Sequence, residues 1–183
     1  MTKQLLITII GILISLNSCK QTEPKKMEES EAREIAETKK ESTESTSITK
    51  SYIENDSLVI VLNSELEKIA LNKKFAIDKN PTKNRHVDNL MDTIVTRTYE
   101  NTKLTSYKAT SEQWVFKAKI ENSEFGLNDF IKVGTKKYVV EKSLAIGIQN
   151  DILKIGNLEQ TSEYILRFES GNLKTIEFNG YMD

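Results

Sequence analysis

Apolar and polar positions divide the chain into three stretches of different character. Residues 5–16 are almost continuously apolar, and residues 20–50 are mostly charged residues, Ser or Thr. Every Phe, Tyr and Trp lies between Tyr52 and Tyr181. Because a folded core needs such side chains, residues 51–183 are predicted to form a single globular domain.

The first part of this domain is predicted to contain a strand, a short helix and a loop. Residues 58–62 form an unbroken aliphatic run, mostly β-branched, which favours a buried strand. Asn63 and Ser64 are suited to cap a short helix that continues through Ala70. Residues 78–92 are polar, contain a proline and show no periodicity, so a long loop is predicted there.

Three more strands are predicted in the middle of the domain. Residues 93–99 and 103–109 are rich in β-branched side chains and flank Asn101 and Thr102, which predicts a hairpin. Apolar and polar side chains alternate along residues 113–121, as in a strand with one buried face. The predicted buried side chains of this strand are Trp114, Phe116, Ala118 and Ile120.

A second helix and a terminal hairpin are predicted near the end of the chain. Thr135 is expected to cap the helix, which runs to about Ile146. In the hairpin, a two-residue turn at Gly171 and Asn172 mixes apolar and polar residues on each face. A three-residue turn over residues 170–172 gives one consistent apolar face and is therefore predicted. Its predicted pairs are Leu166 with Ile176 and Tyr164 with Phe178.

Together these elements predict an α+β domain. Short connections favour an antiparallel sheet of about five strands, and two short helices are expected to pack on its apolar face. The predicted apolar face carries Trp114, Phe116, Ile120, Leu166, Phe168 and Ile176. The opposite face, which is expected to meet solvent or a partner, carries Lys117, Lys119, Glu121, Arg167 and Glu177.

The apolar run at the N-terminus has the length of a secretory signal peptide. It follows Lys3 and is shorter than the roughly 20 residues that a membrane-spanning helix needs. The residues at its end, Leu16-Asn17-Ser18-Cys19, resemble the lipobox of bacterial lipoproteins. This resemblance implies that residues 1–18 are removed and that Cys19 is acylated, and two or more acyl chains anchor a protein stably.

The lipobox resemblance also implies a location and a tether. In enteric-type envelopes a residue other than Asp after the cysteine, here Lys20, permits export to the outer membrane. We therefore expect a lipid-anchored protein of the cell envelope, held in the outer membrane and facing the periplasm or the cell surface. Residues 19–50 carry mixed charges and few apolar side chains, so they are predicted to be a disordered or marginally helical tether.

The composition argues against several classes of function. The chain has 26 Lys and Arg against 27 Asp and Glu, which argues against nucleic acid as the partner. One cysteine and one histidine are too few for a zinc site, a disulfide or an iron–sulfur cluster. The sequence also contains no glycine-rich phosphate loop and no calcium-binding loop, so no cofactor is expected.

Few side chains are candidates for catalysis. His86 lies in the polar region, and no Gly-x-Ser-x-Gly nucleophile motif accompanies it, so a structural or incidental role is expected. Trp114 is expected in the core, the alternative being an exposed stacking platform for sugars or peptidoglycan. Five carboxylates could in principle do acid–base chemistry, but their spacing does not distinguish them from an ordinary hydrated surface. No catalytic or metal-binding residue is therefore predicted. These carboxylates are Glu65, Glu67, Glu121, Glu124 and Asp129.

The last third of the domain carries a second resemblance. Residues 130–135, Phe-Ile-Lys-Val-Gly-Thr, lead into a predicted short helix with Val140 and Leu144, and a strand pair turns at residues 171–173. This arrangement resembles the beta-lactamase-inhibitor-like and BamE (SmpA)-like small envelope lipoprotein domains. The resemblance implies protein binding or envelope assembly rather than catalysis. The Gly-Thr step also fits a simple strand-to-helix turn.

The leading hypothesis is a non-enzymatic lipoprotein, anchored through Cys19, whose domain binds another envelope protein or component. The polar face or a sheet edge is expected to make this contact. The candidate interaction face consists of Lys117, Lys119, Glu121 and Arg167. Two alternatives stay open, namely a carboxylate-dependent hydrolase or glycan-processing enzyme, and an immunity or inhibitor protein.

Overall fold

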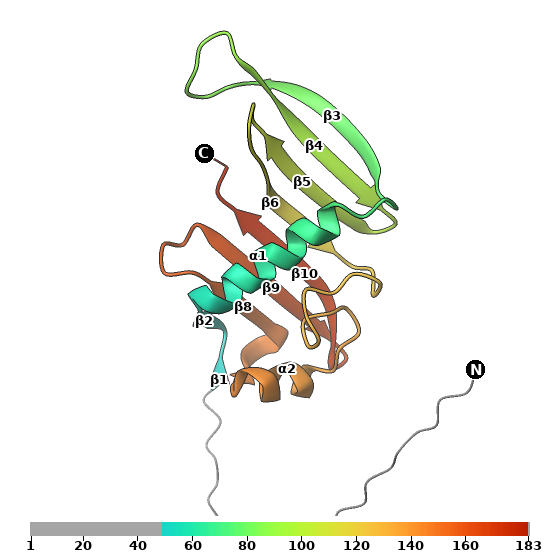
Figure 1. Cartoon of the computed structure of the whole chain (residues 1–183). Coiled ribbons are helices and arrows are strands. Elements are labelled where there is room, and N and C mark those ends of the chain that lie inside the picture. The colour runs from blue at the N-terminus through green and yellow to red at the C-terminus, as the bar shows by residue number, and fades with distance from the viewer. Residues whose placement is uncertain (1–48, 183) are drawn as a thin grey trace, which may run out of the picture. The chain divides into compact units, whose positions relative to one another are not determined.

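The computed structural model describes residues 49–182, so the predicted signal peptide and nearly all of the predicted tether lie outside the described residues. The described chain forms an α+β domain (Figure 1). Eight strands form one mostly antiparallel sheet in the order β2-β8-β9-β10-β6-β5-β4-β3. These strands are β2 (Tyr52–Glu54), β3 (Ala76–Lys83), β4 (Met91–Tyr99), β5 (Thr102–Lys108), β6 (Gln113–Ile120), β8 (Ile152–Gly156), β9 (Ser162–Glu169) and β10 (Asn172–Gly180).

Two helices and a small parallel strand pair complete the domain. Helix α1 (Asp56–Ala70) crosses one face of the large sheet, and α2 (Lys137–Leu144) lies near β1 at one end of the domain (Figure 1). Strands β1 (Thr49–Lys50) and β7 (Gly147–Ile148) pair in parallel, and a single 3-10 turn (Gln149–Asp151) leads into β8. The α+β prediction is therefore confirmed, whereas the predicted number of about five strands is wrong.

The region predicted as the first strand belongs to α1, so the prediction for residues 58–62 is wrong. Asn55 caps this helix, because its Oδ1 accepts a 2.9 Å hydrogen bond from a backbone N–H of the first turn. The predicted cap at residues 63–64 lies inside the helix. Ile60 and Val61 are 68% and 50% exposed, so the unbroken apolar run conceals the helical period. The buried residues of the helix are Val59, Leu62, Leu66 and Ala70.

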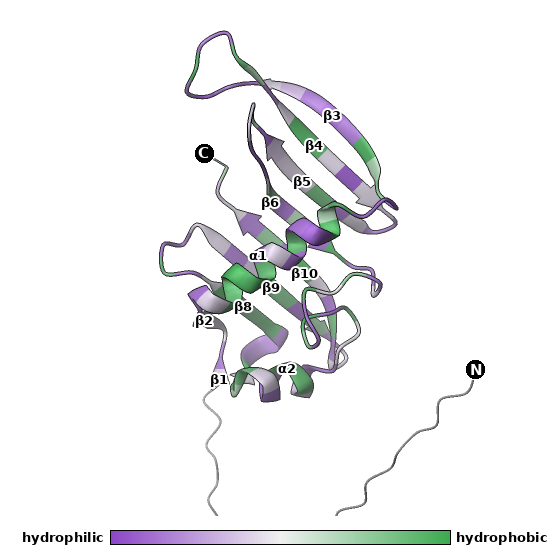
Figure 2. Ribbon diagram, in the orientation of Figure 1, coloured by the Kyte–Doolittle hydropathy of each residue, from purple (hydrophilic) through white to green (hydrophobic). Residues whose placement is uncertain are grey.

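The region predicted as a long loop contains β3 and the beginning of β4, and the loop itself covers only residues 84–90. Strand β3 stands at the end of the strand order and pairs along its whole length with β4. Most of β3 is hydrophilic (Figure 2). An edge strand with little burial needs no apolar alternation, and it tolerates Pro81 because one of its edges forms no ladder.

The predicted hairpin in the middle of the domain forms from β4 and β5. Tyr99 pairs with Thr102, so the turn consists of Glu100 and Asn101 rather than Asn101 and Thr102. Glu100 has a positive φ of 47°, as the first residue of a tight hairpin turn often does. The hairpin is confirmed, and its turn lies one residue earlier than predicted.

Strand β6 also forms as predicted, but a β-bulge changes which side chains it buries. Lys117 pairs with Thr105, and Val115 pairs with the next residue of β5, so Phe116 is an extra residue. On the N-terminal side of Phe116 the alternation is therefore reversed, and odd-numbered residues face the core in place of even-numbered ones. Val115 is 5% exposed, whereas Trp114 is half-buried on the other face. The predicted core positions of Trp114 and Phe116 are therefore wrong, and the other two predicted positions on this strand are buried.

The terminal hairpin of β9 and β10 has the predicted register and a different turn. The predicted cross-strand pairs of its apolar face are present. The turn consists of Ser170 and Gly171, with φ values of 50° and 74°, as a two-residue hairpin turn requires. Lys174 is an extra residue in β10, and this bulge restores the register that a three-residue turn would have given.

Helix α2 is shorter than predicted, and Thr135 does not cap it. The helix begins at Lys137, and Lys136 occupies the cap position without a side-chain hydrogen bond. The helix ends where Ala145 takes a left-handed conformation, with φ 53°. The predicted extension to Ile146 is therefore wrong.

The core lies between α1 and the face of the large sheet that α1 crosses. Strands β8, β9 and β10 supply most of the sheet side, and the segment between β6 and α2 closes one end. The largest fully buried side chains are Tyr164, Leu62, Leu66, Leu104, Ile120, Leu127, Ile131, Leu153, Ile155, Leu166, Leu173 and Ile176.

Candidate binding surfaces

The large sheet has one face covered by α1 and one face that α1 leaves uncovered. Residues that pair directly across antiparallel strands share a face, so the pairings identify each side. A continuous row of paired residues crosses six strands on the uncovered side. The row consists of Tyr52, Lys154, Ile165, Glu177, Lys119 and Lys103. We call the side of the sheet that carries this row the open face.

The structure places all five predicted polar-face residues on the open face. Glu177 pairs with Lys119 across β10 and β6, and the Arg167 Nε lies 3.0 Å from the Glu177 Oε1. The Lys119 Nζ lies 2.8 Å from the Glu121 Oε1, and Lys117 lies two residues away on the same strand. We call the alternating charges of Lys119, Glu121, Arg167 and Glu177 the charge ladder. It extends over three adjacent strands, β6, β10 and β9.

In the charge ladder the two cations are exposed, the two carboxylates are half-buried, and opposite charges lie side by side. The hydrogen bond to Glu121 raises the pKa of Lys119, with the nearby charges of Glu121 and Glu177 adding to the effect. Exposed ion pairs contribute little to folding stability, because water screens them and two long side chains lose freedom. The ladder therefore adds little to the fold and is available to a partner.

A groove of about 570 Å³ lies at one end of the open face, where β8 and β10 end and β9 begins. We call it the tyrosine groove, because the exposed rings of Tyr52 and Tyr181 line it. Tyr52 lies against Gly156, where an added Cβ would stand 2.7 Å from the tyrosine hydroxyl oxygen. The glycine therefore permits this close approach. Longer polar side chains that also line the groove are Glu54, Gln160, Glu163 and Asn179.

The loop over residues 157–161 forms one wall of the tyrosine groove, and hydrogen bonds hold its shape. The Asn157 side chain accepts a 2.9 Å hydrogen bond from the Ser162 N–H. The Leu158 N–H donates to the Asp56 carboxylate at 2.8 Å, which joins the loop to the beginning of α1. The wall is therefore formed before any ligand binds.

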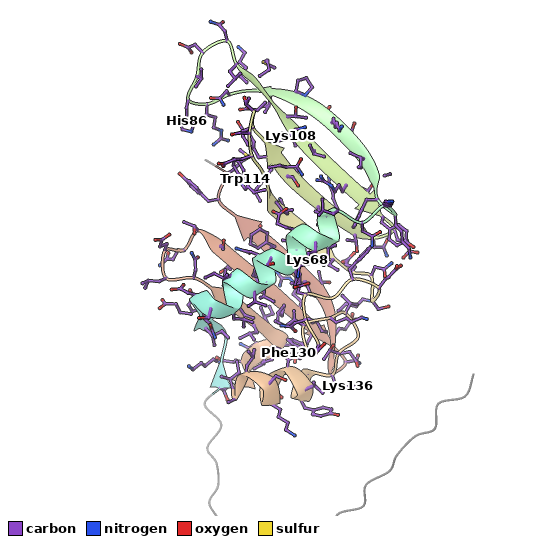
Figure 3. All side chains as sticks on the ribbon, viewed as in Figure 1. Lys68, His86, Lys108, Trp114, Phe130 and Lys136 are labelled. Carbon is purple, nitrogen blue, oxygen red and sulfur yellow. The ribbon has the colours of Figure 1, made fainter. Side chains whose placement is uncertain are left out.

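Trp114 lies beside Tyr181 and not in the core. Its Nε1–H donates to the Tyr181 carbonyl oxygen at 3.2 Å, and its ring centroid lies 5.1 Å from that of Tyr107. A smaller hollow of about 250 Å³ is lined by both Trp114 and Tyr181 and also by residues of α1. Figure 3 shows Trp114 near Lys108, at the end of the sheet from which the β3–β4 loop extends.

Asp92, which is 3% exposed, joins the β3–β4 loop to the sheet. Its Oδ2 accepts hydrogen bonds from the Tyr107 hydroxyl and from the Asn84 Nδ2, and its Oδ1 has no partner among the described residues. Within the loop, the backbone N–H of His86 donates to the Asn84 Oδ1 at 2.8 Å (Figure 3). The only histidine of the chain thus lies in a polar turn, away from the charge ladder.

Glu65, Glu124 and Asp129 line one hollow of about 640 Å³ together with Lys132, whereas Glu67 and Glu121 lie elsewhere. Glu65 and Glu124 each form an ion pair with a lysine, and the Glu67 Oε1 accepts a 2.5 Å hydrogen bond from the Val115 N–H. Within residues 49–182, no group of three or more His, Asp or Glu side chains could hold a metal ion. No catalytic arrangement is inferred from them.

Sequence reasoning identified the charge ladder residues but missed the tyrosine groove. Tyr52 and Tyr181 lie at opposite ends of the domain sequence, and the strand order brings them to one groove. The only hint in the sequence was a tyrosine at each end of the aromatic stretch. That hint does not reveal that the two rings are neighbours.

Comparison with protein-family models, with curated proteins and with solved structures finds no match for this chain. Among the helices that the structure describes, none has the length and apolar character to cross a membrane. The function is therefore inferred from the sequence and from the surfaces of the domain.

Proposed function

We propose that this protein is a lipoprotein of the bacterial outer membrane, anchored through acylated Cys19, whose domain binds another envelope protein and catalyses no reaction. The observation that carries this proposal is the charge ladder on a sheet face that α1 leaves uncovered. Alternating charges fix the register of a partner and speed its encounter, more than they add affinity. The partner is expected to present charges in the opposite order.

The position of Cys19 supports a domain that acts at a distance from the membrane. Twenty-nine residues lie between Cys19 and Thr49, the first residue of β1. A chain of this length spans at most about 100 Å when fully extended. The resemblance of the last third of the chain to small envelope lipoprotein domains points to the same class of function.

Charge reversal on the ladder tests the binding proposal. We expect cross-linking in cells to recover a stoichiometric partner with the wild-type protein. The double variant Lys119→Glu and Arg167→Glu should reduce this recovery by about tenfold or more. The two new carboxylates would repel the acidic groups with which the partner is expected to meet Lys119 and Arg167. The matched control is Lys142→Glu, which reverses an exposed charge on α2. Equal recovery with both variants, or a monomer without any partner, would contradict the proposal.

A further inference from the structure

We propose that the tyrosine groove binds a glycan, that is, a neutral, hydroxyl-rich chain of sugar rings. This inference depends on neither the acylation of Cys19 nor a protein partner on the charge ladder. It rests on the volume of the groove, on the chemistry of its polar side chains and on the two tyrosine rings that it exposes.

The volume suits a ligand of several rings. The groove is open on one side and has a volume of about 570 Å³, within the range of roughly 300–1,000 Å³ that is common for ligand sites. The smaller hollow beside Trp114 shares Thr161, Ser162, Gly180 and Tyr181 with it, so the two hollows are neighbours.

The polar side chains of the groove match a ligand that both donates and accepts hydrogen bonds. Gln160 and Asn179 carry amides that can do both, and Glu54 and Glu163 carry carboxylates that accept. Hydroxyl groups satisfy both kinds of partner. An anionic ligand would face two carboxylates, and an apolar ligand would remove water from them without replacing their hydrogen bonds. Lys154 lies 3.1 Å from Glu163 and offsets part of this charge.

The two tyrosine rings are suited to stack on sugar rings. Tyr52 is 41% exposed and Tyr181 is 60% exposed, and each offers a flat apolar surface with a polar tip. A pyranose ring likewise combines an apolar C–H face with hydroxyl groups at its edge. Flat aromatic faces next to amides and carboxylates therefore match both parts of such a ring.

Contacts within the domain hold the backbone at Tyr181 and the ring of Tyr52. The Tyr181 N–H donates to the Thr161 carbonyl oxygen at 2.9 Å, and the Tyr181 carbonyl accepts from Trp114 at 3.2 Å. Tyr52 rests against Gly156, which leaves no room for a Cβ. A site that is already formed avoids the cost of ordering loops and side chains when it binds.

An extended peptide matches this groove less well. Peptides that add to a sheet pair their backbone with a free strand edge. The nearest edge strand, β2, has only three residues, and the groove offers side chains rather than a long row of free backbone groups. A lysine-rich peptide remains the competing ligand for the two carboxylates, and the experiment includes it.

Titration of the mature chain tests the inference. The Cys19→Ala variant of residues 19–183 carries no acyl chain and keeps the whole domain. Its single tryptophan, Trp114, bonds directly to Tyr181 and reports on the groove by fluorescence. We expect saturable binding of chitotetraose or maltotetraose, confirmed by calorimetry. Tyr52→Ala and Tyr181→Ala should each weaken binding by about tenfold or more, as loss of a central aromatic contact does.

A matched control separates the loss of a groove ring from the loss of any exposed ring. Tyr138→Ala removes a ring that is 67% exposed on α2 and should bind as the parent does, whereas Tyr181→Phe keeps the groove ring and should bind more tightly than Tyr181→Ala. If an alanine variant does not give the parent's thermal melting curve, Glu54→Gln is tested in its place. Glu54 is exposed, and this substitution should also weaken binding. The proposal would be overturned if neither glycan saturates the protein by about 10 mM, or if only pentalysine binds. Binding that Tyr52→Ala, Tyr181→Ala and Glu54→Gln all leave unchanged would also overturn it.

Discussion

Tyr164 shows how a polar group is accommodated in the centre of this core. It is the largest of the fully buried side chains, and its hydroxyl donates a 2.7 Å hydrogen bond to the Asn63 Oδ1 of α1. Burial raises the pKa of the Tyr164 hydroxyl above its ordinary value, and the charge of Glu67 raises it further. The neutral hydroxyl is therefore part of the folded state.

Replacing this hydroxyl should change both the stability and its dependence on pH. We expect Tyr164→Phe to lower the free energy of unfolding by about 1 kcal/mol at neutral pH, because Asn63 loses its donor. A raised pKa stabilises the fold below the unfolded-state value of about 10, and this contribution is lost as the pH rises further, because only the unfolded chain ionises readily. Tyr164→Phe should therefore lose less stability than the wild type above pH 10.

Urea unfolding at a series of pH values up to about 11 measures both effects on Tyr164. Tyr138→Phe is the matched control, because Tyr138 is 67% exposed and makes no contribution to the core. The same alkaline loss of stability in Tyr164→Phe and in the wild type would contradict this explanation.

At the scale of the elements, two β-bulges decide which side chains face α1. Phe116 in β6 and Lys174 in β10 are extra residues that have no partner in the ladder. A strand has a period of two, so each extra residue exchanges its faces. In β10 this exchange places both Leu173 and Ile176 on the covered face, where both are buried.

Deleting single residues of β10 should separate the bulge from the register. We expect deletion of Lys174 to leave every other cross-strand pair in place, with a change in the free energy of unfolding below about 1 kcal/mol. Deletion of Glu177 should cost about 3 kcal/mol or more, because it moves either Phe178 or Ile176 out of the core. Urea unfolding followed by Trp114 fluorescence measures both. Equal losses from the two deletions would show that Lys174 is not the extra residue.

The elements that the sequence predicted well are those with a clear period of two. The β9–β10 register followed from its consistent apolar face, although the bulge that produces it was not visible in the pattern. Residues 58–62 were misassigned because a short apolar run does not distinguish a buried strand from a helix with apolar residues all round. Strand β3 was missed because an exposed edge strand imposes no apolar alternation.

For the whole molecule, the first question is whether the chain is attached to a membrane. We expect labelled palmitate to enter the wild-type protein and not Cys19→Ala. The acyl chains would be carried by the Cys19 thiol and by the amino group that removal of residues 1–18 would expose on Cys19. The Cys19→Ala variant should also leave the membrane fraction. Ser18→Ala is the matched control, since a small residue is kept before the cysteine. Equal label in the wild type and Cys19→Ala would exclude the anchor.

The two candidate surfaces differ in how far a sequence can predict them. The charge ladder lies on strands whose alternation is visible in the sequence, so Lys117, Lys119 and Glu121 could be assigned to one face. The tyrosine groove depends on the order of strands in the sheet, which brings β2 beside β8 and the end of β10 beside the beginning of β9. No local pattern carries that information.

The polar character of β3 has a consequence for neighbouring copies of this protein. A lipid anchor confines molecules to a plane, where copies collide often and an open strand edge invites aggregation. The lysines and Pro81 of β3 make it a poor template for a foreign strand, and β2 at the other edge is only three residues long. Both edges therefore resist pairing with a second copy, and with the proposed anchor this would leave the broad face of the sheet free to meet a different molecule.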